Sequence, residues 1–147
     1  MAGFFWAFTV VVMPGLEEAE TAPAAAMAAM QGINAVVQSA LFGLFFFGAP
    51  LLCILAIAHA VTVRDSVWRW VEAAAAAIYI LGVPVVTFTQ NIPLNDELDT
   101  LDPAMPADAA RMGQWISDWS TWNDIRTITG LIATALFTIA LVQRARR

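Results

Sequence analysis

The apolar stretch at residues 23–63 limits more than any other feature what this chain can fold into. As a single α-helix it would be about 60 Å long, whereas the hydrocarbon core of a bilayer is about 30 Å thick. The stretch must therefore be divided, and we place the division at the polar residues Gln38 and Ser39. Residues 23–38 are then expected to form an outer or half-inserted helix, and residues 40–63 a complete span.

The composition also indicates an integral membrane protein. Of the 147 residues, 60% are hydrophobic and only 13% are charged, whereas about 25% of the residues of a soluble domain are charged. The length suits one domain, which we expect to comprise residues 1–147. The net charge of −5 argues against nucleic acid as a partner, because no basic stripe is available to neutralise phosphates.

Three more apolar segments complete the prediction of an all-α membrane protein, a bundle of four transmembrane helices. The spans are expected at about residues 2–16, 40–63, 70–88 and 125–142. The first would be roughly 22 Å long as a helix, which is short for a span, so either the lipid thins beside it or residues are missing from its start. An extra outer helical segment precedes the second span, and a long outer loop precedes the fourth.

The distribution of charge predicts the topology. The turn at residues 64–69 and the tail at 144–147 hold five arginines, while the loops at 17–20 and 91–124 hold ten acids and only Arg111. Because positive residues favour the cytoplasmic side, both termini are expected in the cytoplasm. The membrane is expected to be an inner or plasma membrane, with the polar loops on its outer side.

A stripe of aromatic and polar side chains at the start of the fourth span is the first candidate site. Trp115, Trp119, Trp122 and Arg126 recur at helical spacing, and Asn123 lies beside them. One interpretation is an aromatic belt at the membrane surface, with the guanidinium reaching the lipid headgroups. The other is a guanidinium inside the bundle, where indole faces and the cation would bind a planar, anionic or ionisable aromatic ligand.

Two sets of amides are further candidates. Asn91 and Asn95 flank Pro93 in what we expect to be a turn ending the third span. They either cap backbone groups freed by the proline or bind a ligand. Gln31 and Asn34 share one face of the outer helix, where they either join helices or contact a ligand.

Other reactive residues give no recognisable catalytic or metal-binding pattern. Cys53 is the only cysteine and His59 the only histidine, and no cluster has the spacing of metal ligands. We therefore expect no metal and no cofactor. His59 is expected to be a polar residue satisfied near the cytoplasmic interface, and Glu72 to pair with it or with Arg69. The phenylalanines are expected to face lipid or pack in the core, and Pro84 to kink the third span.

Several motifs together resemble one family, and the resemblance covers essentially the whole chain. The more specific motifs are Asn-x-Pro-Leu-Asn at residues 91–95 and Trp-x-x-x-Asn-x-x-Arg at residues 119–126. Weaker motifs are Phe-Trp-Ala-Phe at 5–8, Val-Met-Pro-Gly-Leu at 12–16 and Ala-Met-Gln-Gly-Ile-Asn at 29–34. This order resembles the anthrone oxygenase-like family of small four-helix membrane proteins. Its members usually carry more residues before Gly3, which leaves open whether Met1 is the natural start.

The resemblance implies an activity, the oxidation of an anthrone to an anthraquinone by O₂ without metal or flavin. Arg126, with Asn91, Asn95 or Asn123, would then stabilise a substrate carbanion or phenolate. The base would have to come from the carboxylates, for which the candidates are Asp96, Asp118 and Asp124. Two other functions stay open: a module that binds a hydrophobic ligand without changing it, and an accessory subunit of a larger membrane complex.

Overall fold

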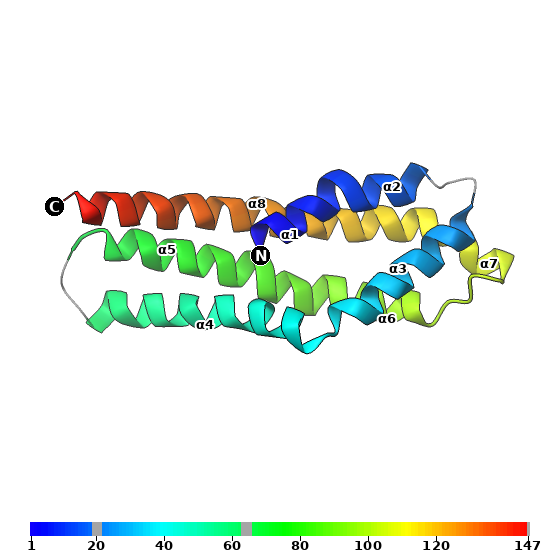
Figure 1. The fold of residues 1–147 in the computed structure, drawn as a ribbon, viewed down its shortest axis with the longest axis horizontal. Helices are drawn as coiled ribbons and strands as arrows, with labels where there is room; N and C mark the ends of the chain where they lie inside the picture. The colour runs from blue at the N-terminus through cyan, green and yellow to red at the C-terminus, as the bar shows by residue number, and fades with distance from the viewer. Residues whose placement is uncertain (19–21, 63–65, 147) are drawn as a thin grey trace.

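Three long helices form the frame of the protein. The computed structural model describes residues 1–18, 22–62 and 66–146, and every regular element in these ranges is a helix. The helices long and apolar enough to cross a bilayer are Ala40–Thr62, Arg69–Asp99 and Pro106–Ala145. They run along the length of an elongated bundle (Figure 1). The predicted all-helical class is therefore confirmed, with three helices of spanning length.

The first helix is shorter than a span and covers only part of this frame. It is continuous from α1 (Ala2–Ala7) through η1 (Phe8–Val12) to α2 (Met13–Glu17). Figure 1 shows its start beside the middle of the bundle and its end in the half of the bundle that carries α7 (Pro106–Ala109). We call the end of the bundle that carries α7 the mouth end, and the end that carries the C-terminus the tail end.

The apolar stretch is divided where its polar residues predict. Helix α3 (Pro23–Val37) ends just before Gln38, and α4 (Ala40–Thr62) begins just after Ser39. Figure 1 shows α3 crossing the mouth half of the bundle at an angle, while α4 runs along its length. The predicted acidic loop at 17–20 and arginine turn at 64–69 lie partly outside the described residues.

The third long helix continues further than the sequence suggested. Its successive parts are α5 (Arg69–Ile80), η3 (Leu81–Val85), η4 (Thr87–Asn91) and α6 (Ile92–Asp99). The expected turn at residues 91–95 is wrong, because the chain stays helical there. The π-helical η4 runs directly into α6, and this change of winding accommodates Pro93. Pro84 falls within the π-helical η3, a local change of winding of the kind that accommodates proline in a helix.

The last helix also begins earlier than the predicted span. Helix α8 runs from Met112 to Ala145, so the segment at 112–124, expected in an outer loop, is helical. Only residues 100–111, which include α7, connect α6 to α8. This longer helix therefore carries Trp115, Trp119, Trp122 and Arg126 on one continuous element.

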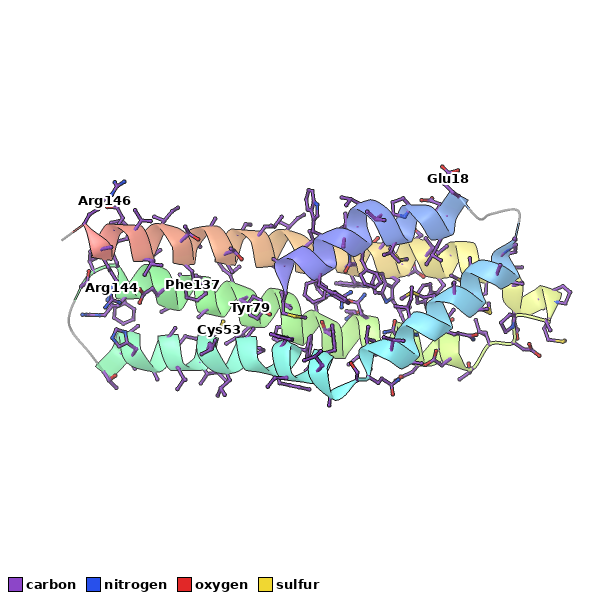
Figure 2. The ribbon with its side chains drawn as sticks, viewed as in Figure 1. Glu18, Cys53, Tyr79, Phe137, Arg144 and Arg146 are labelled. Atoms are coloured by element: carbon purple, nitrogen blue, oxygen red, sulfur yellow. The ribbon has the colours of Figure 1, made fainter. Side chains whose placement is uncertain are left out.

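Two clusters of buried side chains hold the bundle together. The cluster at the mouth end contains Met27, Met30, Leu98, Met112 and Trp115, each at most 1% exposed. The tail-end cluster includes Cys53 and Tyr79, with the partly buried Phe137 packed against it, and Figure 2 shows these three between α4, α5 and α8. Outside these clusters most large apolar side chains of α4 are exposed, as expected of a helix surrounded by lipid.

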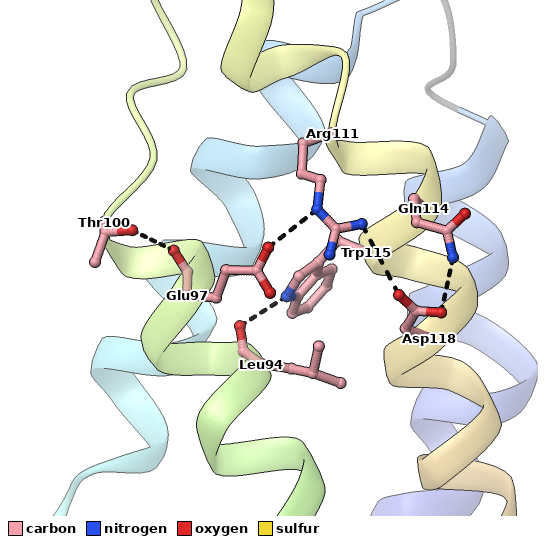
Figure 3. A network of polar contacts seen from close by, with 7 residues as sticks. All are labelled: Leu94, Glu97, Thr100, Arg111, Gln114, Trp115 and Asp118. Carbon is pink, nitrogen blue, oxygen red and sulfur yellow. Dashed lines mark hydrogen bonds and ion pairs between the residues drawn. The ribbon is translucent and has the colours of Figure 1, made fainter.

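Ion pairs fasten both ends. At the mouth end, Arg111 Nε lies 3.0 Å from Glu97 Oε1, and Asp118 lies 3.9 Å from the same guanidinium (Figure 3). At the tail end, the carboxylate of Glu72 pairs at 2.9 Å with Arg144, a partner that the sequence analysis did not name. The register of α5 against α8 brings these distant residues together.

Gln31 fastens α3 to α6, and this contact gives a first prediction. Its Nε2 donates hydrogen bonds of 2.9 Å to the carbonyls of Leu98 and Leu101 at the end of α6. Replacing Gln31 by methionine would leave both carbonyls without this donor, and we expect a loss of about 1–3 kcal/mol in the free energy of unfolding. The measurement is unfolding by denaturing detergent in micelles.

The matched control is the neighbouring Gly32→Ala. A Cβ at Gly32 meets no atom within 4 Å, so this variant should keep at least wild-type stability. Equal stabilities for Gln31→Met and Gly32→Ala would contradict the role given to the Gln31 amide.

Candidate functional site

A cavity of about 490 Å³ lies in the mouth half of the bundle. Its walls come from the first helix, α3, the start of α4, the η4–α6 segment and α8. Eight of its 21 lining residues are aromatic: Phe4, Phe5, Phe8, Phe42, Phe46, Phe47, Phe88 and Trp119. The volume is in the range of sites for small organic ligands, and the rings would suit a flat apolar molecule.

Arg126 forms part of the wall of this cavity. Its side chain is buried, with only 5% of the residue exposed. Its Nη2 donates to Asn123 Oδ1 at 2.9 Å, and its Nη1 donates to Thr87 Oγ1 at 3.3 Å. Its Cζ also lies 4.6 Å from the ring centre of Phe5 and 5.0 Å from that of Trp119. The guanidinium thus faces the bundle interior rather than the lipid headgroups.

The partners of Arg126 are all neutral in the part of the chain that the structure describes. No carboxylate lies within ion-pairing distance, and its buried Nε has no hydrogen-bond partner there. A buried ion without a counter-ion is costly, because two hydrogen bonds and two ring faces replace only part of its hydration. The arrangement leaves a strong positive field at the cavity wall.

Asn123 holds this guanidinium in place. The residue is 0% exposed. Its Nδ2 donates to the carbonyl of Phe5 at 3.1 Å and to Thr9 Oγ1 at 2.9 Å, while its Oδ1 accepts from Arg126. Asn123 does not line the cavity, so its contacts fit a positioning residue that ties the first helix to Arg126.

Three other predicted site residues do line the cavity. Trp119 Nε1 donates to Asn95 Oδ1 at 2.7 Å, which fixes the indole against α6. Asn34, on α3, donates to Asp99 Oδ1 at 3.2 Å. Trp119, Asn95 and Asn34 therefore lie around the same space as Arg126, although they come from three helices.

The remaining predicted residues lie elsewhere. Asn91 is buried and donates to the carbonyl of Trp119 at 3.3 Å, and Trp115 donates to that of Leu94 at 2.7 Å. Trp122 lines a different depression, and Gln31 makes the contacts to α6 already described. The stripe of Trp115, Trp119, Trp122 and Arg126 on α8 therefore has two different surroundings. One edge of it packs on the η4–α6 segment, and the other edge borders the cavity.

Some of the acidic residues also line the cavity, whereas others lie elsewhere. Asp96 and Asp99 line the cavity, whereas Asp118 bonds to Gln114 and Asp124 accepts from Thr9 Oγ1 at 2.9 Å. The sequence prediction missed Asp99 because it treated residues 91–95 as a turn. On a helix, Asn95 and Asp99 are four apart and share a face, so a helical assignment would have indicated Asp99.

The sequence prediction also missed Thr87 and the cavity phenylalanines. Helical periodicity places a phenylalanine on one face of a helix, but it does not distinguish a face that borders lipid from one that borders a cavity. Among the described residues, no group of three or more histidine, cysteine or acidic side chains is placed to hold a metal ion.

Comparison with known proteins gives one match. A family model described as anthrone oxygenase matches residues 35–136, which is more than half of the chain. The matched segment runs from the end of α3 into α8 and includes Asn95, Trp119, Asn123 and Arg126. Neither a curated protein nor a solved structure matches the chain.

Proposed function

The chain belongs to the anthrone oxygenase family, and on that premise we propose that it binds a hydrophobic, ionisable aromatic molecule beside Arg126 and oxidises it with O₂. The observation that carries the proposal is the buried guanidinium, which has only neutral partners among the described residues and lies at the wall of an aromatic cavity. Such a cation is costly for folding but stabilises an anion that forms beside it.

The proposed reaction needs no group beyond the substrate, O₂ and the side chains. A ring CH₂ next to a carbonyl loses a proton to a carboxylate of the cavity, for which Asp96 and Asp99 are the candidates. The remaining charge spreads to the carbonyl oxygen, which Arg126 stabilises. O₂ then forms a bond to the carbon, and cleavage of the O–O bond releases water. The balance is CH₂ + O₂ → C=O + H₂O.

Each side chain of the site has a distinct proposed role. Arg126 is the catalytic cation, and Asn123 positions it through the bonds to Phe5 and Thr9. Trp119 and the buried phenylalanines Phe5, Phe8 and Phe46 hold the flat rings, and Asn95 and Asn34 bind polar groups of the ligand. Asn91, Trp115, Trp122 and Gln31 support the surrounding helices rather than touching the ligand.

The membrane arrangement is part of the proposal. We place all residues in one domain of four membrane helices, with the first helix packed along α8 as the fourth member. Arg144 and Arg146 lie at the tail end and Glu18 at the mouth end (Figure 2). The positive-inside rule then puts both termini in the cytoplasm and the cavity toward the outer face of an inner or plasma membrane.

The experiment is oxidation of a simple anthrone, 1,8-dihydroxyanthrone, by the purified protein in lipid vesicles. We expect quinone formation with one O₂ consumed per product, at a rate about 100-fold or more above protein-free vesicles. Native mass spectrometry of the gently solubilised protein identifies what co-purifies with it. Anthrone bound but not oxidised would leave a binding module instead, and a co-purifying protein without bound anthrone would indicate an accessory subunit.

A further inference from the structure

We propose that the ligand reaches this cavity sideways from the bilayer, through a portal between α4 and the η4–α6 segment, and that it passes through in its neutral form. The inference rests on the proposed function, because it concerns the ligand of the same site. It depends on three residues that the sequence analysis did not include among the site candidates, namely Gly43, Phe47 and Phe88.

The exposed side chains of the cavity wall mark where it opens. They come from two places only: the elbow and first turns of α4, with Gln38, Ser39 and Phe47, and the facing segment, with Phe88, Asp96 and Asp99. Phe47 is 61% exposed and Phe88 is 50% exposed. The cavity therefore opens along the gap between these two elements.

The helix on one side of this gap is held mainly by rings. Phe46 and Phe47 contact Phe88 at centroid distances of 6.0 and 6.3 Å, and Phe42 contacts Phe4 at 5.0 Å. Among the described residues, no side-chain hydrogen bond or ion pair joins residues 40–51 to another helix. Ring contacts lack the directional constraint of hydrogen bonds, so this part of α4 can separate from η4 at small cost.

Gly43 keeps the passage wide. It lines the cavity, and a Cβ added to it would meet no atom within 4 Å. The neighbouring Leu41, Leu44 and Phe45 are between 62% and 68% exposed, which places this turn of α4 among lipid chains. A molecule dissolved in the bilayer thus has direct access to the cavity beside Gly43.

The edges of the portal define the chemistry of what passes. One edge is apolar, with Phe47 and Phe88, and the other is polar, with Gln38, Ser39 and the carboxylates of Asp96 and Asp99. This suits a flat hydrocarbon ring system with oxygen atoms along one side. The two carboxylates repel an anion, so the ligand enters uncharged and loses its proton only next to Arg126.

The test is to bridge the portal. In a Cys53→Ala background, Phe47→Cys and Phe88→Cys are joined by a reducible bis-methanethiosulfonate. Binding of 1,8-dihydroxyanthraquinone, supplied in vesicles, is then followed by stopped-flow quenching of tryptophan fluorescence. We expect both the association and the dissociation rate constants to fall about tenfold or more, with little change in Kd and full recovery after reduction. The control is the same double variant treated with a monofunctional reagent.

A second pair of variants tests the portal without cross-linking. Gly43→Trp should block the passage and slow association about tenfold or more, whereas Gly48→Trp should behave as wild type. Gly48 lies on the same helix, has equal space for a Cβ and does not line the cavity. Wild-type rates in both the bridged protein and Gly43→Trp would overturn the portal while leaving the binding site intact. Failure of the wild-type protein to bind the probe would instead overturn the proposed function.

Discussion

Replacing Arg126 by methionine should weaken binding of the ionised ligand by about 100-fold or more without lowering the free energy of unfolding. Among the described residues that line the cavity, Arg126 is the only cation, so its loss removes the field that stabilises the anion. Methionine fills a similar volume and carries no charge to desolvate. A buried ion without a counter-ion carries a desolvation cost, and removing this cost offsets that of leaving Asn123 Oδ1 without its donor.

Two variants serve as controls for this prediction. Arg144→Met breaks the pair with Glu72 at the tail end and should lower stability while leaving ligand affinity unchanged. Arg126→Lys keeps the charge but loses the planar donors that meet Asn123 and Thr87, so it should give intermediate affinity. Binding is measured by titration in vesicles, and stability by denaturing detergent. An Arg126→Met protein that binds as well as wild type would remove Arg126 from the site.

Composition and periodicity predicted the features that depend on burial in lipid. The excess of apolar residues indicated membrane helices, and the limit on span length divided the apolar stretch at Gln38 and Ser39, as observed. The spacing of Trp119 and Arg126 placed both on one side of a helix, and both line the cavity. These inferences succeed because lipid leaves a backbone few alternatives to helix.

Features that depend on contacts between distant segments could not be predicted in the same way. Pro93 is equally consistent with a turn and with a helix that changes its winding, and the packing of η4 and α6 against α8 selects the helix. Trp115 and Trp119 lie on the same stripe, yet one is bonded to Leu94 in the core and the other borders the cavity. Periodicity identifies which residues share a face of a helix. Whether that face packs on another helix or borders a cavity depends on how all the helices are arranged.

Gly82→Ala should be the most damaging small substitution outside the site. A Cβ at Gly82 would overlap the Cβ, Oγ1 and Cγ2 of Thr129, because η3 packs directly on α8 at this point. One of the two helices would have to move, at an expected cost of about 3 kcal/mol in the free energy of unfolding. The same movement would separate Thr87 from Arg126, since each lies only a few residues beyond the contact.

Rescue distinguishes this steric mechanism from a general weakness of the helix. Adding Thr129→Gly removes all three overlapping atoms, so the double variant should be more stable than Gly82→Ala alone. The glycine placed at position 129 costs about 1 kcal/mol in helix propensity, which is less than the cost of the overlap. Gly48→Ala, where a Cβ meets nothing within 4 Å, should be at least as stable as wild type. If Gly82→Ala matches Gly48→Ala in unfolding, then η3 does not approach α8 closely, and the distance between Thr87 and Arg126 has some other cause.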